Sequence, residues 1–172
     1  AAVRSLLRRP AADARGPGRP HNAPMLDALL RTVHLLAAIV WIGGMVFAHF
    51  CLRPSLAVIE PPPQRLALMR AVLGRFFAWV AGAALLAVGT GVAMAARRGW
   101  TLAPSLWLML AGGLVMLVIF GGIRHALYPR LCAALDRGAP ADAAAHLASI
   151  RTWVLANLVI GTVIVVAAGV WR

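Results

Sequence analysis

The sequence predicts an all-α fold, an integral membrane four-helix bundle, and three observations carry that prediction. The hydrophobic fraction is 62% and the mean hydropathy is +0.82, whereas soluble domains are about 45–50% apolar. Four apolar runs of about 20 residues or more can each cross a ~30 Å hydrocarbon core as a helix. All 17 basic residues are Arg, and beyond the first 24 residues they lie mainly between these runs. The excess apolar surface therefore has to face lipid.

Residues 1–24 differ in composition from the rest of the chain. They contain five Arg together with several Pro and Ala, and no aromatic residue, which predicts a disordered basic tail. The stretch lacks the apolar core of a signal peptide. Met25 follows directly, so a mis-assigned start is the alternative to a genuine tail. Residues 25–172 are the predicted transmembrane domain.

The connections between the apolar runs are short. The first, residues 53–72, contains Pro54 and three successive prolines at 61–63, which we expect to break any helix. The second span ends at Arg97-Arg98-Gly99, and a DRGAPAD turn precedes the fourth span. The predicted spans are residues 28–52, 73–96, 105–128 and 150–170.

The distribution of Arg predicts the orientation in the membrane. The first and third connections, with the adjoining helix ends, carry eight Arg, and the opposite side without the tail carries four. Because cytoplasmic loops are enriched in basic residues, we expect these two connections in the cytoplasm of a bacterium, with the chain in its inner membrane. The termini are then periplasmic if Met25 is the start. Counting the five Arg of the tail reverses the balance.

One face of the first span carries polar groups at helical spacing. At ~100° per residue, His34, Trp41, Met45 and His49 fall on nearly the same face, and an ionisable residue within a span is a functional candidate by default. One interpretation is a buried His that bonds a neighbouring carbonyl, with Trp packed below it. The other is a ligand to haem iron or copper, which both accept neutral imidazole.

A second group of candidates lies near the ends of the spans. His49 and His125 are predicted at matching depth, and His146, Cys51 and Cys132 are close to that level. Sulfur and imidazole are ligands that Cu(I) prefers. The alternative is that these histidines anchor to headgroups and that the cysteines are small apolar fillers.

Met94 and Met109 lie nearer the level of His34, so a Met/His path for Cu(I) can be drawn, although Met is also a common core filler. The chain shows no nucleophile beside a base, so an enzyme is not the favoured prediction. It also shows no intramembrane carboxylate pair, which argues against a proton-driven transporter of the usual carboxylate type. No basic face alternates with aromatic residues, so nucleic acid is not an expected partner.

The segment LLRTVHLLAAIVWIGGMVFAHFCLRPSL resembles the first helix of the copper-resistance protein D (CopD) family, with its His, a Trp seven residues later and Gly-Gly. LGRFFAWVAGAALLAVGTGVAM, LVMLVIFG and IRTWVLANLVIGTV are similar to the later helices, so the resemblance covers residues 26–171. It implies a four-helix inner-membrane bundle in copper passage or tolerance, with a periplasmic copper-binding protein as a partner.

A related branch, the HemJ-type protoporphyrinogen oxidases, implies haem b bound through the His at position 34. The chain departs from that branch, since Gly-Gly-Met-Val-Phe follows Trp41 and the sequence has no Lys.

Three hypotheses follow from the sequence. The first is a copper-handling membrane protein, the second a haem b protein that uses His34 in electron transfer or haem biosynthesis, and the third an accessory subunit without a cofactor. The lipid bilayer is a partner in all three. The predicted copper ligands are His34, His49, His125, Met45 and Met109.

Overall fold

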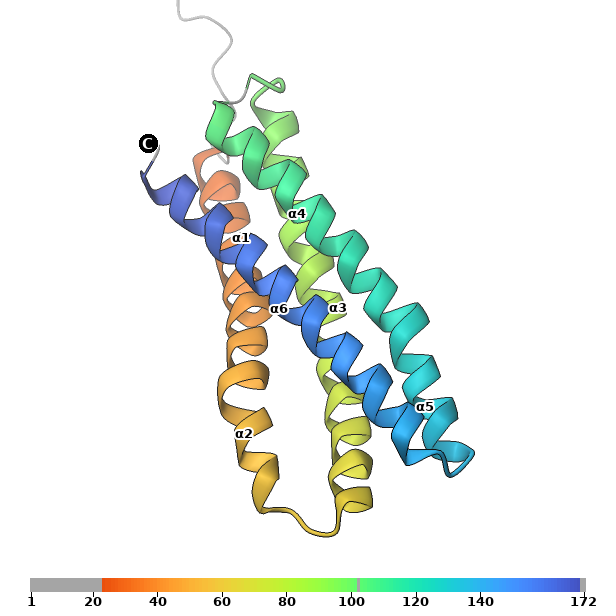
Figure 1. Ribbon diagram of the computed structural model, residues 1–172. Coiled ribbons are helices and arrows are strands. Elements are labelled where there is room, and N and C mark those ends of the chain that lie inside the picture. Colours follow the sequence, from red (N-terminus) through yellow and green to blue (C-terminus); the bar gives the residue numbers. More distant parts are fainter. Residues whose placement is uncertain (1–22, 102, 171–172) are drawn as a thin grey trace, which may run out of the picture.

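The computed structural model describes residues 23–101 and 103–170, and every regular element within them is helical. Four long helices form a bundle (Figure 1). They are α1 (Ala23–Val46), α3 (Pro62–Arg97), α4 (Pro104–Gly122) and α6 (Pro140–Val170). Shorter elements prolong them: η1 (Phe47–Leu52), α2 (Arg53–Ser55), η2 (Leu56–Val58), η3 (Ile123–Leu127) and α5 (Tyr128–Asp136). The predicted all-α membrane bundle is confirmed.

The described residues contain four helical stretches that are long and apolar enough to cross a membrane. Counted with their extensions they are Pro24–Val58, Pro63–Arg97, Pro104–Asp136 and Pro140–Val170. The start of α1, the end of α3, the start of α4 and the end of α6 meet at one end of the bundle, here called the terminus-side end (Figure 1). The two longer connections meet at the other end, here called the loop-side end.

Arginines mark where the bundle leaves the apolar layer. Arg31 and Arg53 are 22 residues apart on the first span, and Arg75 and Arg97 are 22 residues apart on the second. At 1.5 Å per residue this spacing is about 33 Å, close to the thickness of a bilayer core. Between these levels the outward-facing side chains are apolar: Leu35, Ile39, Val40, Leu85 and Leu86 are all exposed. This belt is the lipid-facing surface.

The helices extend beyond this belt at the loop-side end. α6 begins at Pro140 rather than near residue 150, and α3 begins at Pro62 rather than near residue 73, so the predicted connections are largely helical. The extensions bury their own apolar side chains, among them Leu131, Ala134 and Leu147. The length of an apolar run therefore predicts the length of the lipid-facing part of a helix, and the whole helix is longer.

The expectation that Pro54 breaks the first helix was wrong. The chain stays helical to Val58 because the turn before the proline widens to a π-helix, in which the Arg53 N–H donates to the Ala48 carbonyl five residues back. A proline has no N–H for the carbonyl four residues earlier, and its ring presses on that carbonyl. A widened turn relieves both effects. The same arrangement recurs at Pro129, two residues after the π-helical turn η3.

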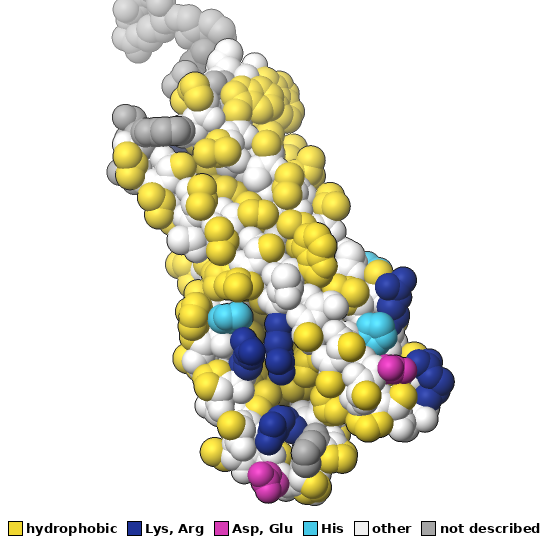
Figure 2. All heavy atoms as spheres, viewed as in Figure 1, with side chains coloured by type: hydrophobic (Ala, Val, Ile, Leu, Met, Phe, Trp, Pro, Cys, Tyr) yellow, Lys and Arg dark blue, Asp and Glu magenta, His cyan; other side chains and the backbone are white. Residues whose placement is uncertain are grey.

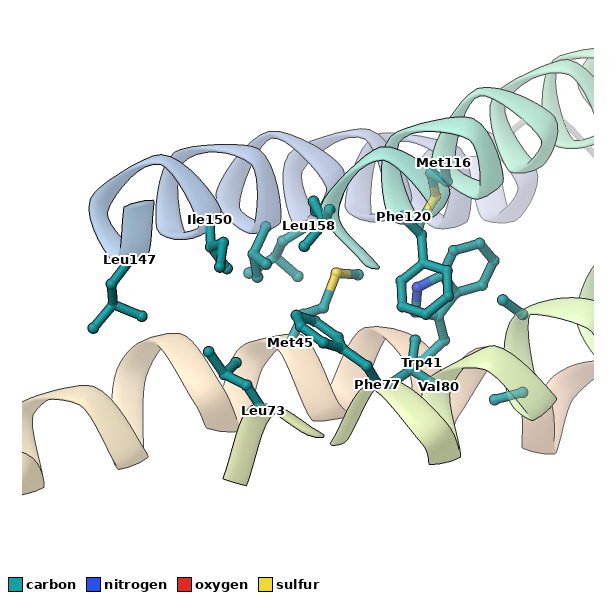
Figure 3. Packing of buried hydrophobic residues seen from close by; sticks show 14 of the residues in the cluster. Trp41, Met45, Leu73, Phe77, Val80, Met116, Phe120, Leu147, Ile150 and Leu158 are labelled. Atoms are coloured by element: carbon teal, nitrogen blue, oxygen red, sulfur yellow. The ribbon is translucent and has the colours of Figure 1, made fainter. Parts of the chain in front are cut away.

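Aromatic side chains fill the middle of the bundle. The Phe77 ring is 1% exposed and meets Phe120 and Tyr128 edge to face, with ring centroids 6.0 and 5.4 Å apart. Phe120 meets Trp41 at 6.5 Å in the same manner. Figure 3 shows Trp41, Phe77 and Phe120 with Met45 between the helices. This aromatic core separates the terminus-side half of the bundle from the loop-side end.

The predicted tail, residues 1–24, lies outside the described residues except for positions 23 and 24, where α1 begins. The predicted end of the second span at Arg97-Arg98-Gly99 is confirmed, and α4 begins at Pro104, one residue before the predicted start of the third span.

Candidate functional site

His34 bonds across to α3, and the bond fixes its tautomer. Its Nδ1 lies 2.8 Å from the Ala87 carbonyl oxygen and 3.1 Å from Thr90 Oγ1. A carbonyl can only accept a hydrogen bond, so Nδ1 carries the proton and donates it. In the neutral ring Nε2 then keeps a free lone pair. Metal-ligating histidines typically donate their second N–H in this way, often to a backbone carbonyl.

Two features of α3 prepare the place for this ring. Thr90 Oγ1 lies within 2.6 Å of the Leu86 carbonyl and 3.1 Å of the Ala87 carbonyl, so its own hydroxyl is satisfied by the helix backbone. One position further on, Gly91 lies against the imidazole, and a Cβ there would be in ordinary contact with His34 Cε1 at 3.5 Å. A larger side chain at this position would occupy the space beside the ring.

His34 borders a cavity of about 160 Å³ in the terminus-side half of the bundle. All four long helices contribute to its wall, which is apolar apart from a few groups. Three methionines line it, Met94 on α3 and Met109 and Met116 on α4. Gly161 gives the cavity part of its width, because a Cβ there would come within 3.0 Å of Met116 Cε. One imidazole and three methionines therefore line the same cavity.

Two buried polar atoms, one in the cavity wall and one in a residue that bonds it, have no hydrogen-bond partner among the described residues. One is the indole Nε1 of Trp41, which lines the cavity. The other is Oδ1 of Asn157, one turn before Gly161, whose amide Nδ2 donates to the Met116 carbonyl at 3.3 Å. Buried donors and acceptors are normally satisfied, often by an ordered water. These two atoms add a donor and an acceptor to a region that is otherwise apolar.

Arg98 brings a positive charge to the wall of the cavity, and no acidic residue is among the described residues that line it. It lies just after the end of α3, at the terminus-side end. On the same side, the Asp27 carboxylate pairs with Arg97, with Oδ1 and Nε 2.6 Å apart. A cation that enters from this end therefore passes a like charge before it reaches His34.

A family model described as CopD, copper resistance protein D, matches residues 70–171, which is more than half of the chain. The chain belongs to the CopD family. No curated protein and no solved structure matched it. The match links this CopD protein to copper resistance, and the expected resemblance is confirmed.

The CopD match covers α4, α5 and α6 entirely, and α3 from residue 70 onward. Met94, Met109, Met116 and Thr90 lie inside the matched segment, whereas His34 lies in α1, outside it. The family match therefore rests on α3 to α6, whereas the imidazole comes from α1. Residues from both parts of the chain line the cavity.

The structure separates the predicted ligands of this CopD protein. His34 and Met109 share the cavity wall, whereas Met45 is 2% exposed in the aromatic core and does not line the cavity. His49 lines a different, open groove near the loop-side end. His125 is exposed on η3. The predicted stripe keeps its phase only to Val46, since the π-helical turn that follows shifts His49 away from it.

The described residues contain no group of three or more His, Cys, Asp or Glu that could hold a metal ion. The predicted gathering of His49, His125 and His146 with the two cysteines is thus not found as such a group. Cys51 is exposed, Cys132 is partly buried, and both are free thiols. Methionine sulfur atoms are the soft ligands that the cavity offers instead.

Haem fits this cavity poorly. Its volume of about 160 Å³ is below the ~300–1,000 Å³ of pockets that hold drug-sized ligands, and a haem macrocycle is larger than most of these. A single metal ion needs far less room. The residues present therefore do not favour the haem alternative.

Sequence reasoning missed Thr90, Met116 and the carbonyl of Ala87 as neighbours of His34. Thr90 stands between Gly89 and Gly91 in an apolar helix, and a hydroxyl between two small residues is typical of a point where helices approach closely and bond. That signal was available. The carbonyl partner was not, because it depends on the rotation of α3 about its axis.

Proposed function

We propose that this CopD protein handles Cu(I) in the membrane and that the ion occupies the cavity beside His34. His34 Nε2 is the nitrogen ligand, and thioethers of Met94, Met109 and Met116 are the sulfur ligands. Two observations support the proposal: Nδ1 bonds the Ala87 carbonyl, so that in the neutral ring the Nε2 lone pair is available, and three methionines line the same cavity as His34. The copper link of the family supports the choice of metal.

The chemistry of the ligand set favours Cu(I) over harder ions. Thioether and imidazole ligands select soft metals, whereas carboxylate, carbonyl and water suit Mg²⁺, Ca²⁺ and Mn²⁺. The cavity wall has no carboxylate among its described residues. Neutral ligands also leave the ionic charge uncompensated, which in an apolar interior costs less for a monovalent than for a divalent ion.

The charge of Arg98 adds to this selection. Repulsion between a fixed positive charge and a passing cation grows in proportion to the charge of the cation, and single arginines serve as such barriers in other membrane pathways. A divalent ion therefore meets about twice the barrier that Cu(I) meets.

We further propose that the terminus-side end faces the periplasm. The support is the excess of Arg around the loop-side end, which by the distribution of basic residues belongs in the cytoplasm. The cavity would then be reached from the periplasm, where a copper-binding protein could deliver or receive the ion.

The test is an anaerobic Cu(I) titration of the detergent-purified protein against a chromophoric Cu(I) chelator. Both free thiols are replaced first, as Cys51→Ser and Cys132→Ser, because thiolates also bind Cu(I). We expect one Cu(I) per chain. His34→Gln can still donate to the Ala87 carbonyl but loses the free imidazole nitrogen, so its affinity should fall at least about 10-fold.

His49→Gln is the matched control, since it changes the same residue type on the same span outside the cavity. Its Cu(I) affinity should equal that of the parent protein. Equal affinity in the His34 variant, with an unchanged elution profile in size-exclusion chromatography, would remove His34 from the site. A parent protein that binds no Cu(I) would favour the accessory-subunit alternative.

A further inference from the structure

A second hollow lies near the loop-side end, on the other side of the aromatic core from the cavity. It is an open groove of about 460 Å³ between the end of the first span, the start of α3 and α6. Its basic lining consists of Arg53, Arg65 and Arg151 together with His49. Figure 2 shows basic side chains with a histidine beside them in a hollow toward this end of the molecule. We call it the arginine groove.

Within the part of the chain that the structure describes, no ion pair balances the positive charge of the arginine groove. No acidic residue is among its described lining residues, and the ion pairs found among the described residues, Arg70 with Asp136 and Arg97 with Asp27, lie elsewhere. Arg53 also lies near enough to Arg151 for their charges to repel. Three arginines close together without an acidic residue create a positive potential, which attracts an anion from outside the protein.

Two of these guanidinium groups have unused donors. The Nε atoms of Arg65 and Arg151 are buried and have no hydrogen-bond partner among the described residues. Arg65 is held in place by its Nη2, which donates to the Ile59 carbonyl at 3.0 Å. A buried N–H without an acceptor is costly, more so when it is charged. Oxyanions with several acceptor oxygens, above all phosphate, match such convergent arginine donors.

The remaining walls of the groove are apolar and open toward lipid. Phe50, Pro54, Leu56 and Ala57 line it, and the Phe50 side chain is 61% exposed. Arg151 stands two residues before Trp153, which is exposed at the start of the lipid-facing part of α6, and Trp is typical of the membrane interface. The groove thus places a cationic pocket at headgroup depth beside an apolar wall at acyl-chain depth.

We propose that the arginine groove binds the phosphate of an anionic phospholipid, with the acyl chains along Phe50. The recognised chemistry is a phosphate oxyanion, and the lipid is favoured over free phosphate because the apolar wall and the interfacial level suit an acyl chain. Basic pockets between transmembrane helices are a known means of lipid headgroup recognition. The proposal does not depend on copper.

Native mass spectrometry of the full chain in detergent tests it, with phosphatidylglycerol and phosphatidylcholine added in parallel. We expect one phosphatidylglycerol to remain bound under conditions that remove phosphatidylcholine. Arg53→Gln and Arg151→Gln should each weaken its binding about fivefold, the effect of one basic side chain near an anionic surface. Arg53 is exposed, so its variant reports on binding even if the Arg151 variant folds poorly.

Arg75→Gln is the matched control, because Arg75 is exposed at the same membrane boundary and does not line the groove. It should bind the lipid as the parent protein does. Equal losses in all three variants would mean diffuse surface charge and would overturn the proposal. So would equal retention of the two lipids. Displacement by sodium phosphate that exceeds displacement by sodium chloride at equal ionic strength would assign the groove to free phosphate instead.

Discussion

The cavity beside His34 and the arginine groove lie on opposite sides of one aromatic core, and they differ in enclosure, charge and ligand type. Apart from Arg98, the cavity is lined by apolar side chains, one imidazole and three methionines. The groove is open and carries three arginines. Soft uncharged donors suit a soft cation, whereas convergent cationic donors suit an oxyanion.

This difference shows how one apolar bundle can hold two unlike sites. In each site a backbone carbonyl accepts a hydrogen bond that orients a nitrogen-containing side chain. The Ala87 carbonyl bonds His34, and the Ile59 carbonyl bonds Arg65. At His34 the bond leaves a ring nitrogen that can bind a metal ion, and at Arg65 it leaves N–H donors. The side-chain chemistry then determines whether a cation or an anion is attracted.

The largest expected effect is the loss of folding stability when a side chain of the aromatic core between the two sites is truncated. Phe77→Ala removes a ring that is 1% exposed and in edge-to-face contact with Phe120 and Tyr128. Such a truncation costs about 3–5 kcal/mol in protein cores. Reversible unfolding in mixed micelles measures it. The exposed Trp79→Ala, on the same helix, is the control and should change stability far less.

A second prediction separates methionine as a ligand from methionine as a filler. Met109 lines the cavity and Met45 lies in the aromatic core. Leu nearly conserves the volume of Met, so neither substitution should cost much stability. Met109→Leu should lower Cu(I) affinity about 10-fold, and Met45→Leu should leave it unchanged. If both variants bind alike, the thioether at 109 is packing and not a ligand.

The smallest effect concerns Asn157, a buried polar residue that bonds the backbone of the cavity-lining Met116. Asn157 is 1% exposed and donates one bond to the Met116 carbonyl. Hydrogen bonds between transmembrane helices average about 0.6 kcal/mol, and Leu fills a similar volume, so Asn157→Leu should destabilise the bundle only slightly. The same unfolding assay checks this. A loss as large as that of Phe77→Ala would reveal a polar network in which Asn157 is the central member.

The sequence predicted the fold because run length and hydropathy are local properties. It placed the lipid-facing parts of the four helices correctly but missed their extensions at the loop-side end, since the mixed composition near residues 62–72 and 140–149 does not distinguish helix from loop. Pro54 misled for a different reason. Whether a proline breaks a helix depends on the turn before it, and a π-helical turn leaves no clear sequence pattern.

The candidate site was predictable only in part. His34 follows from its position inside an apolar run, and Met109 from its level on the third span. Depth in the membrane alone, however, led us to expect one site from His49 and His125, which lie on different helices. His49 instead lines the arginine groove, and His125 is exposed on η3. Azimuth around each helix decides which side chains meet, and the π-helical turns change that azimuth for both histidines.

Copper K-edge X-ray absorption of the Cu(I)-loaded protein, with both cysteines replaced by Ser, tests the central claim most directly. The account predicts a first shell that contains sulfur from thioethers and one nitrogen, with the outer-shell scattering of a single imidazole. The imidazole scattering should vanish in His34→Gln and persist in His49→Gln. A shell of nitrogen and oxygen alone, or imidazole scattering that survives in His34→Gln, would contradict a His/Met site in the cavity.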